Sequence, residues 1–263
     1  VILHGHFFSC RASAWRLDYR CPFMALDVLA FCAHPDDAEL NCAGLLLRAK
    51  SSGASIGVCD LTHGEAGTRG TAAERDREAA EAARVLGLDE RINLDLPDGA
   101  VTCTLENRIK LIEVIRAHRP RLIIAPYWED HHPDHTNTSL LSQEAWWFAG
   151  VGKHAGIGSP HRPESILHYM ARYQFRPSLV VDISDHWQHK RKAVACYRSQ
   201  LYDPTRGEPE TAISADSFLD AWEGRNRYYG SLIGVEYGEP YLMRGPVPVE
   251  DPMTLTFGRR AVL

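Results

Sequence analysis

The chain has 263 residues, of which 44% are hydrophobic and 24% are charged, and its formal net charge is -5. This is the composition of an ordinary folded domain with enough apolar side chains for a sizeable core. It holds no Lys/Arg tract of the kind that binds nucleic acid, and no apolar run approaches the ~20 residues needed to cross a bilayer.

Residues 1–23 differ in pattern from the rest of the chain, with scattered aromatic and basic residues and neither strand nor helix period. Met24 directly precedes the first strand-like run. We therefore expect residues 1–23 to be a non-native or disordered extension and residues 24–263 to form one domain. The seven cysteines include no CxxC pair, so we expect a reducing, cytoplasmic location.

Strand-like and helix-like segments alternate along the chain. Apolar runs predict strands at 26–32, 55–61, 91–94, 121–126, 165–173, 179–183 and 237–243. Apolar residues at periods of three and four predict helices at 39–51, 73–86, 104–118, 138–148, 217–232 and from 184 or 185 to about 200. This alternation indicates a single Rossmann-like α/β domain, in which helices flank a mostly parallel sheet.

Two clusters of histidine and aspartate follow two of these predicted strands. Residues 33–39 read Ala-His-Pro-Asp-Asp-Ala-Glu, and residues 130–135 read Asp-His-His-Pro-Asp-His. Sites in open α/β sheets form outside the carboxyl ends of the strands, so we expect the clusters to share one crevice. An isolated His-Pro-Asp-Asp would more simply be a turn with a helix cap. The second cluster favours a metal site, for which His34, Asp37 and His135 are candidate ligands.

These residues resemble the LmbE-like, or GlcNAc-phosphatidylinositol de-N-acetylase-like, family of zinc deacetylases. The hallmarks of the family are an AHPDDxE motif, here at 33–39, and a later HPDH motif, here at 132–135. The carboxy-terminal Gly-Ser-Leu-Ile-Gly at 230–234, with Tyr237 and Glu239, is similar to the bacillithiol-biosynthesis branch. Members of that branch remove acetate from N-acetylglucosaminyl-malate, so the resemblance implies this substrate.

The resemblance also implies a metal-dependent N-deacetylase, a hydrolase of linear amides. His34, Asp37 and His135 would hold one Zn²⁺ per chain, and Fe²⁺ accepts the same ligands. Asp36 would be the general base that takes a proton from the attacking water; otherwise it is a hydrogen-bond acceptor beside the ligands.

Two residues of the second motif have implied catalytic roles. His132, in its protonated form, would stabilise the oxyanion, and Asp134 would orient His132 and favour its charged form. Asp134 could equally cap the following helix. Some family members use a tyrosine on the oxyanion, and this sequence does not identify one.

The small-molecule partner would be an amino-sugar conjugate. Arg75, Arg69 and His63 are the candidate substrate-binding residues, and Arg172 is a further cation for a malate carboxylate. Three of these have a simpler reading: Arg75 could form surface ion pairs, and Arg69 and His63 could be solvated loop residues. We also expect a homo-oligomer, for which the aromatic residues 146–148 could form an interface or belong to the core.

Other classes of protein fit the sequence less well. A dinucleotide site is disfavoured because no GxGxxG follows the first strand, and a serine esterase because GxSxG is absent. Another acetylated sugar or a thiol conjugate stays open as the substrate. A phosphoesterase would normally need two metal ions, and a non-catalytic zinc-containing sugar-binding protein would be expected to lack the base, which is present as Asp36.

Overall fold

The structure is a computed structural model that describes residues 24–247, 249 and 251. The expected extension at 1–23 lies outside these residues. Among the helices described, none combines the length and the apolar character that crossing a membrane requires.

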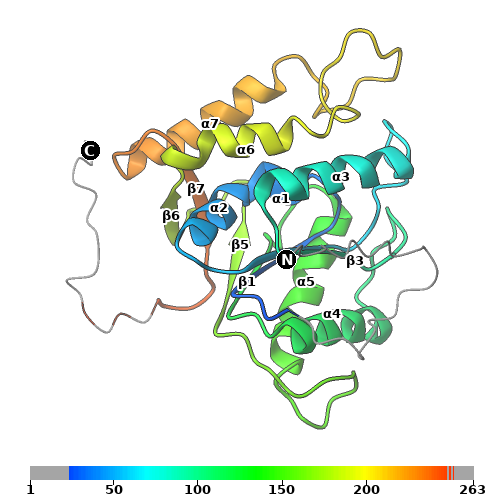
Figure 1. The fold of residues 1–263 in the computed structure, drawn as a ribbon, viewed down its shortest axis with the longest axis vertical. Helices are drawn as coiled ribbons and strands as arrows, with labels where there is room; N and C mark the ends of the chain where they lie inside the picture. Colours follow the sequence, from blue (N-terminus) through cyan, green and yellow to red (C-terminus); the bar gives the residue numbers. More distant parts are fainter. Residues whose placement is uncertain (1–23, 248, 250, 252–263) are drawn as a thin grey trace, which may run out of the picture.

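A seven-stranded sheet forms the centre of the fold, in the order β3-β2-β1-β4-β5-β7-β6 (Figure 1). The strands are β1 (Val28–Cys32), β2 (Ile56–Asp60), β3 (Glu90–Asn93), β4 (Leu122–Pro126), β5 (Ser165–Tyr169), β6 (Leu179–Asp182) and β7 (Gly238–Leu242). The pairs from β3 to β5 are parallel, whereas β7 runs antiparallel to both β5 and β6. The predicted mostly parallel α/β sheet is therefore confirmed.

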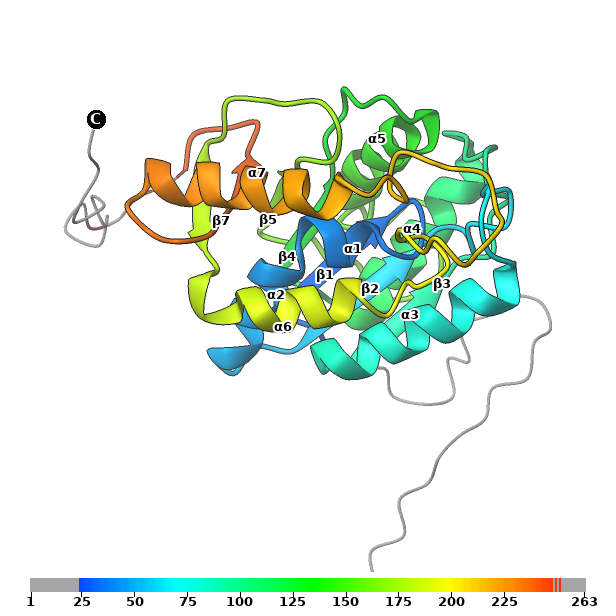
Figure 2. The ribbon, with the colours of Figure 1, turned by 90° about the horizontal axis from the view of Figure 1, so that it is seen from above.

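Helices cover both faces of this sheet (Figures 1 and 2). They are α1 (Asp37–Asn41), α2 (Ala43–Ser51), α3 (Ala72–Leu86), α4 (Leu105–His118), α5 (Pro133–Phe148), α6 (Trp187–Val194) and α7 (Phe218–Leu232), with a short 3₁₀ helix η1 (Ser184–His186). Helices α4 and α5 lie on one face, and the other helices lie on the opposite face.

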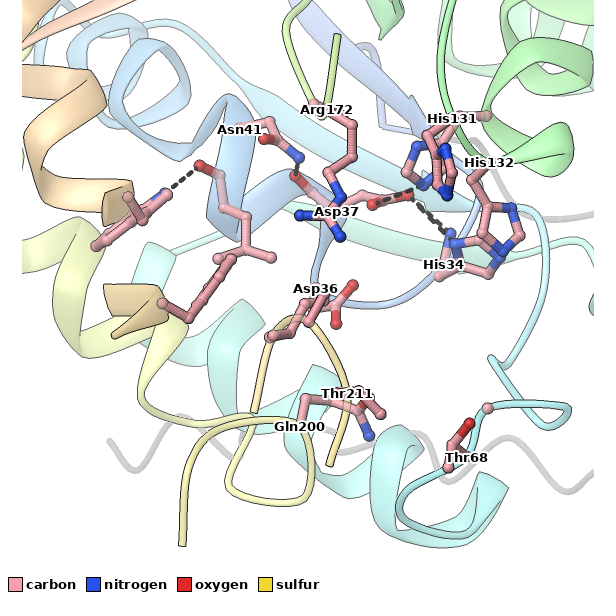
Figure 3. A pocket seen from close by; sticks show the side chains of 18 of the residues that line it. His34, Asp36, Asp37, Asn41, Thr68, His131, His132, Arg172, Gln200 and Thr211 are labelled. Carbon is pink, nitrogen blue, oxygen red and sulfur yellow. Dashed lines mark hydrogen bonds and ion pairs between the residues drawn. The ribbon is translucent and has the colours of Figure 1, made fainter. Parts of the chain in front are cut away.

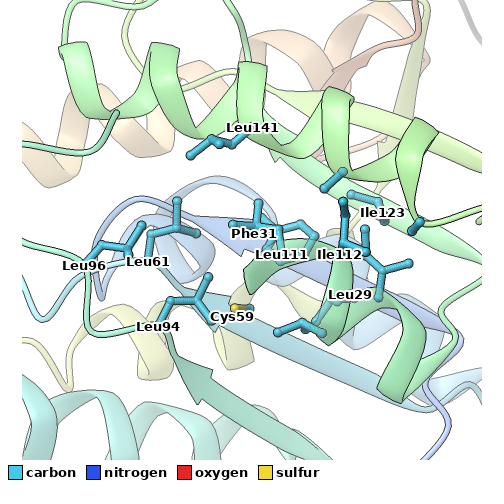
Figure 4. Close-up of a cluster of buried hydrophobic side chains, with 14 of the residues drawn as sticks. Leu29, Phe31, Cys59, Leu61, Leu94, Leu96, Leu111, Ile112, Ile123 and Leu141 are labelled. Carbon is cyan, nitrogen blue, oxygen red and sulfur yellow. The ribbon is translucent and has the colours of Figure 1, made fainter. Parts of the chain in front are cut away.

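The central strand β1 is buried on both sides, which explains its continuous apolar sequence. Leu29 and Phe31 pack in the cluster beneath α4 and α5, together with residues such as Leu111 and Leu141 (Figure 4). The alternate β1 residues pack in a second cluster on the side of α1 and α2. The carboxyl end of β1 is thus held rigidly between two cores, where the first His/Asp motif begins.

Three helix boundaries differ from the sequence prediction. The predicted helix at 39–51 divides into α1 and α2 at Cys42. Helix α5 begins earlier, at Pro133, because His132 caps it and proline suits the first helical turn. Helix α6 ends at Val194 rather than near 200, since the chain turns there and the Glu78 carboxylate accepts the N–H of Ser199.

The division at Cys42 has a specific cause. Helix α2 begins there because the Glu239 carboxylate, on β7, accepts the main-chain N–H groups of Gly44 (2.8 Å) and Leu45 (2.7 Å). Lys190 donates to the same buried carboxylate. A carboxylate at a helix N-terminus satisfies free N–H groups and interacts favourably with the helix dipole. The last strand of the sheet therefore fixes the helix pair that follows the first motif.

Candidate metal centre

The first motif lies in the turn between β1 and α1. Asp36 has a φ of 106°, a positive value that residues other than glycine rarely adopt. The Asp37 carboxylate holds the turn together, because its Oδ2 accepts the N–H groups of Ala33 (3.1 Å) and His34 (3.0 Å). The turn therefore fixes the directions of the two neighbouring aspartates.

The second motif follows β4, which is the direct parallel neighbour of β1. The two motifs meet in one crevice, where His135 Nε2 lies 3.2 Å from Asp37 Oδ1. One potential ligand atom from each of His34, Asp37 and His135 lies within 4.8 Å of the others, and all three residues are buried. The arrangement thus brings together the three predicted ligands.

The chemistry of this group fits a divalent metal ion. Two imidazoles and one carboxylate are the protein ligands of many catalytic zinc sites, which keep one position for water. Asp130 Oδ1 lies 2.9 Å from His135 Nδ1, so Nε2 is the nitrogen directed at Asp37. A carboxylate behind a ligating histidine is the usual support for metal coordination.

The electrostatic environment also favours a cation. Burial lowers the pKa of His34, but the hydrogen bonds to Asp134 and Asp98 and the charge of Asp37 outweigh it and raise this pKa to about 9. Burial likewise opposes protonation of His135, whereas Asp37 and Asp130 raise its pKa to about 10. The carboxylate charge that holds protons on two buried imidazoles would equally attract a metal ion.

Asp98 is a neighbour of this group that the sequence did not identify. Its Oδ1 lies 3.0 Å from His34 Nε2, and burial is outweighed by that contact, so the pKa of Asp98 falls to about 2. The Gly-rich loop at 62–71, between β2 and α3, holds Asp98: Ala66 N–H donates to the Asp98 Oδ2 (2.9 Å), and the N–H of Asp98 donates to Glu65 (2.8 Å). The turn sequence Leu-Pro-Asp-Gly at 96–99 is the sequence feature that could have pointed to this residue.

Asp36 is only 6% exposed and lies beside the buried Arg75. Burial raises the pKa of Asp36 to about 7, although the charge of Arg75, whose Nη2 is 3.3 Å from Asp36 Oδ2, acts against the increase. Arg75 also donates to the carbonyl oxygens of Gly64 (3.2 Å) and Pro35. Arg75 is therefore buried rather than engaged in surface ion pairs, and its guanidinium supports the turn that carries Asp36.

The expected pairing of His132 with the Asp134 carboxylate is not the contact found. That carboxylate accepts the N–H groups of Gly99 (2.7 Å) and Val101 (3.2 Å). Instead, the main-chain N–H of Asp134 donates to His132 Nδ1 (3.2 Å). Partial desolvation and the neighbouring imidazolium of His34 lower the pKa of His132, although its side chain is exposed, and this favours the neutral ring.

The metal group and Asp36 lie in a cavity of about 630 Å³ (Figure 3), a size that suits a small ligand. Its walls come from residues 66–68 of the Gly-rich loop, the residues after β5 at 171–172, and the segment from 211 to α7. None of the described residues that line it is a tyrosine. His131 is exposed and also lines the cavity.

Two predicted substrate-binding residues do not line this cavity. His63 is held through both ring nitrogens, by Asp76 at 2.6 Å and Asp95 at 2.7 Å. Arg69 is buried and donates to three main-chain oxygens in the loop 199–209. The polar atoms of both side chains are engaged in joining loops, and contact of these two residues with a substrate stays a prediction.

Known proteins resemble this chain over the region that carries both motifs. The family model for GlcNAc-PI de-N-acetylase, PIG-L, matches residues 29–146, which include both motifs. Diacetylchitobiose deacetylase from Thermococcus kodakarensis is 31% identical over 232 residues, covering 81% of this chain and 80% of that protein.

Solved structures share the fold. The conserved protein TT1542 from Thermus thermophilus has a TM-score of 0.80 and 41% identity, over 88% of this chain and 100% of that one. The N,N'-diacetylchitobiose deacetylase of Pyrococcus horikoshii, complexed with an inhibitor, has a TM-score of 0.72 and 27% identity, over 81% of this chain and 82% of that one.

Proposed function

Because the chain belongs to the PIG-L, or GlcNAc-PI de-N-acetylase, family, we propose that it is a metal-dependent hydrolase that removes the N-acetyl group from an amino-sugar conjugate. The observation that carries this proposal is the group of His34, Asp37 and His135 next to the buried Asp36 in one cavity. A metal-ligand set and a base of raised pKa are the parts that amide hydrolysis by water needs.

A bound Zn²⁺ or Fe²⁺ would lower the pKa of a water molecule and polarise the acetyl carbonyl. Asp36 would accept a proton from the attacking water and return one to the amine nitrogen as the C–N bond breaks. A pKa of about 7 suits both steps, because the group accepts and releases a proton near neutrality. Arg75 would hold the Asp36 carboxylate in place through its ion pair while it also donates to the Gly64 carbonyl oxygen.

His132 would assist at the carbonyl oxygen in its neutral form. Its Nδ1 accepts the Asp134 N–H, so the proton of the neutral ring is on Nε2. An Nε2–H group can donate a hydrogen bond to the negative charge that develops on that oxygen. Such a donor typically contributes about 10²–10³ in rate.

The finer substrate proposal is N-acetylglucosaminyl-malate, the substrate of the bacillithiol-biosynthesis branch. The branch-like residues at 230–239 support it by resemblance, although two of them serve the core: Glu239 caps α2, and Tyr237 stacks on Trp187. A second candidate substrate is N,N'-diacetylchitobiose, because the 31% identical relative from Thermococcus kodakarensis is a diacetylchitobiose deacetylase.

Acetate release tests both levels of this proposal. The metal-loaded protein would be incubated with N-acetylglucosaminyl-malate, N,N'-diacetylchitobiose and N-acetylglucosamine, with and without a chelator. Chelator-sensitive release from any of them supports the deacetylase, and the ratio of kcat/KM values assigns the conjugate. A metal-loaded protein that releases acetate from none of the three contradicts the amino-sugar assignment.

A further inference from the structure

Three arginines line the cavity, and their guanidinium groups have different surroundings. Arg75 is paired with the Asp36 carboxylate. Within the part of the chain that the structure describes, no carboxylate lies within ion-pair distance of Arg172 or Arg225. Among the described residues, these two arginines therefore form no direct ion pair, although the buried Glu239 carboxylate acts on Arg225 at longer range.

These two arginines differ in what they can offer to a ligand. Arg225 is occupied with neutral oxygens: it donates to the carbonyls of Met170 (3.2 Å) and Ala171 (2.6 Å) and to Asn41 Oδ1 (3.1 Å). The side chain of Arg172 has no such partner among the described residues; it is exposed and enters the cavity on the side of Asn41 (Figure 3). Arg172 is thus the cation that is available to bind a ligand.

The main chain beside Arg172 is fixed from two directions. Arg225 holds the carbonyl groups of the two preceding residues. The N–H of Arg172 itself donates to Asp130 Oδ2 (3.0 Å), and the other oxygen of Asp130 supports His135. Arg172 therefore starts from a backbone that is tied to a candidate metal ligand, which limits the region that its guanidinium can reach.

We propose that Arg172 determines specificity by binding an anionic group, a carboxylate, on the part of the conjugate beyond the acetylated sugar. The proposal rests on the deacetylase function above and adds the chemistry of the second half of the substrate. A guanidinium presents a planar set of donors that matches a carboxylate. The cavity floor carries Asp36, Asp37 and Asp98, so an anionic substrate needs a cation away from that floor. Arg225 acts as a positioning residue for this cation.

The test compares an anionic and a neutral substrate in matched variants. N-acetylglucosaminyl-malate and methyl N-acetylglucosaminide would be assayed with the wild type, Arg172→Ala, Arg172→Lys and the control Arg176→Ala. Arg176 is exposed in the same segment but does not line the cavity. The ratio of kcat/KM for the anionic over the neutral substrate should fall about 10- to 100-fold in Arg172→Ala, as expected for a lost hydrogen bond to a charged group. Arg172→Lys should lie between, and Arg176→Ala should keep the wild-type ratio.

An equal loss on both substrates, or an unchanged ratio in Arg172→Ala, would overturn the assignment. A wild type that prefers the neutral sugar would overturn it as well. If the wild type hydrolyses neither compound, the proposed function fails, and titration calorimetry with N-acetylglucosaminyl-malate then decides about Arg172. Weaker binding to Arg172→Ala than to Arg176→Ala supports the anion site, and equal binding rejects it.

Discussion

The Arg75 guanidinium lies between the Asp36 carboxylate and Gly64, with its Nη2 3.3 Å from Asp36 Oδ2. A Cβ atom on Gly64 would come within 2.1 Å of Arg75 Nη1, and Gly64 has a φ of +67°. The Gly-rich loop can approach Arg75 this closely only because Gly64 has no side chain. The loop, the arginine and the candidate base therefore form one packed unit.

Replacing Asp36 should separate catalysis from metal binding. Asp36→Asn removes the proton acceptor but keeps the shape of the side chain, so kcat should fall about 10²- to 10⁴-fold. Metal content should stay near that of the wild type, because Asp36 is not in the ligand group. Acetate release and metal analysis of the same sample check both parts. Near-full activity would show that another group is the base.

Replacing Asp130 should weaken metal binding without removing a ligand. Asp130→Asn loses the carboxylate that supports His135, and such changes typically lower metal affinity about 10- to 100-fold. His135→Ala should lose more, and Glu129→Gln, at an exposed neighbouring position, should lose nothing. Competition with a chelating dye gives the affinities. Equal affinity in Asp130→Asn and the wild type would contradict the supporting role.

The metal content of the wild type should be one ion per chain. The two candidate groups among the described residues share His34, which favours a single site. Elemental analysis of the purified protein measures the ratio. Two ions per chain at saturation would instead favour the two-metal chemistry of a phosphoesterase.

Two helical glycines should respond oppositely to alanine. A Cβ on Gly44 would lie 2.7 Å from Glu239 Oε1 and 2.5 Å from Ile183 Cγ2, so Gly44→Ala should destabilise the fold by about 1–3 kcal/mol. Gly224, inside α7, has nothing within 4 Å of such an atom, so Gly224→Ala should stabilise by about 0.5–1 kcal/mol. Denaturant unfolding measures both. A Gly44→Ala protein as stable as the wild type would show that the Glu239 carboxylate can shift away from the added methyl group at no cost in stability.

The contribution of His63 to stability should depend on pH. Burial opposes protonation, but the hydrogen bonds to Asp76 and Asp95 outweigh it and raise the pKa of His63. A raised folded-state pKa gives stability that is fully present below the unfolded value and is lost as the pH rises through the folded value. His63→Ala should therefore lower the Tm more at a pH of about 5.5–6 than at a pH of about 9, as thermal scans at both pH values would measure. The reverse order would contradict the charged bridge.

The strands, most of the helices and the meeting of the two motifs were predictable because they follow from local periodicity and from the topology of parallel sheets. The division at Cys42 was not, since its cause is Glu239, nearly two hundred positions away in the chain. Local sequence patterns cannot predict a helix cap that comes from so distant a residue.

The partners of charged side chains were the least predictable part of the site. Arg69 and His63 lie in the predicted loop but bind other loops, because tertiary packing chooses among many carboxylates and carbonyls. The positions of Asp98 and Asp130 next to His34 and His135 were not predicted from the sequence. An aspartate after a turn or beside a histidine pair is common, and only the fold places these two beside the candidate metal ligands His34 and His135.

The position of β7 between β5 and β6 affects the order in which the protein can mature during its synthesis. Strand β6 reaches the sheet only through β7, and the cap on α2 comes from the same late strand. The first motif is made early, yet the helix pair that follows it stays uncapped until residues 238–242 have been translated. The nascent chain thus carries the candidate metal ligands in an unfinished setting until that later strand has been synthesised.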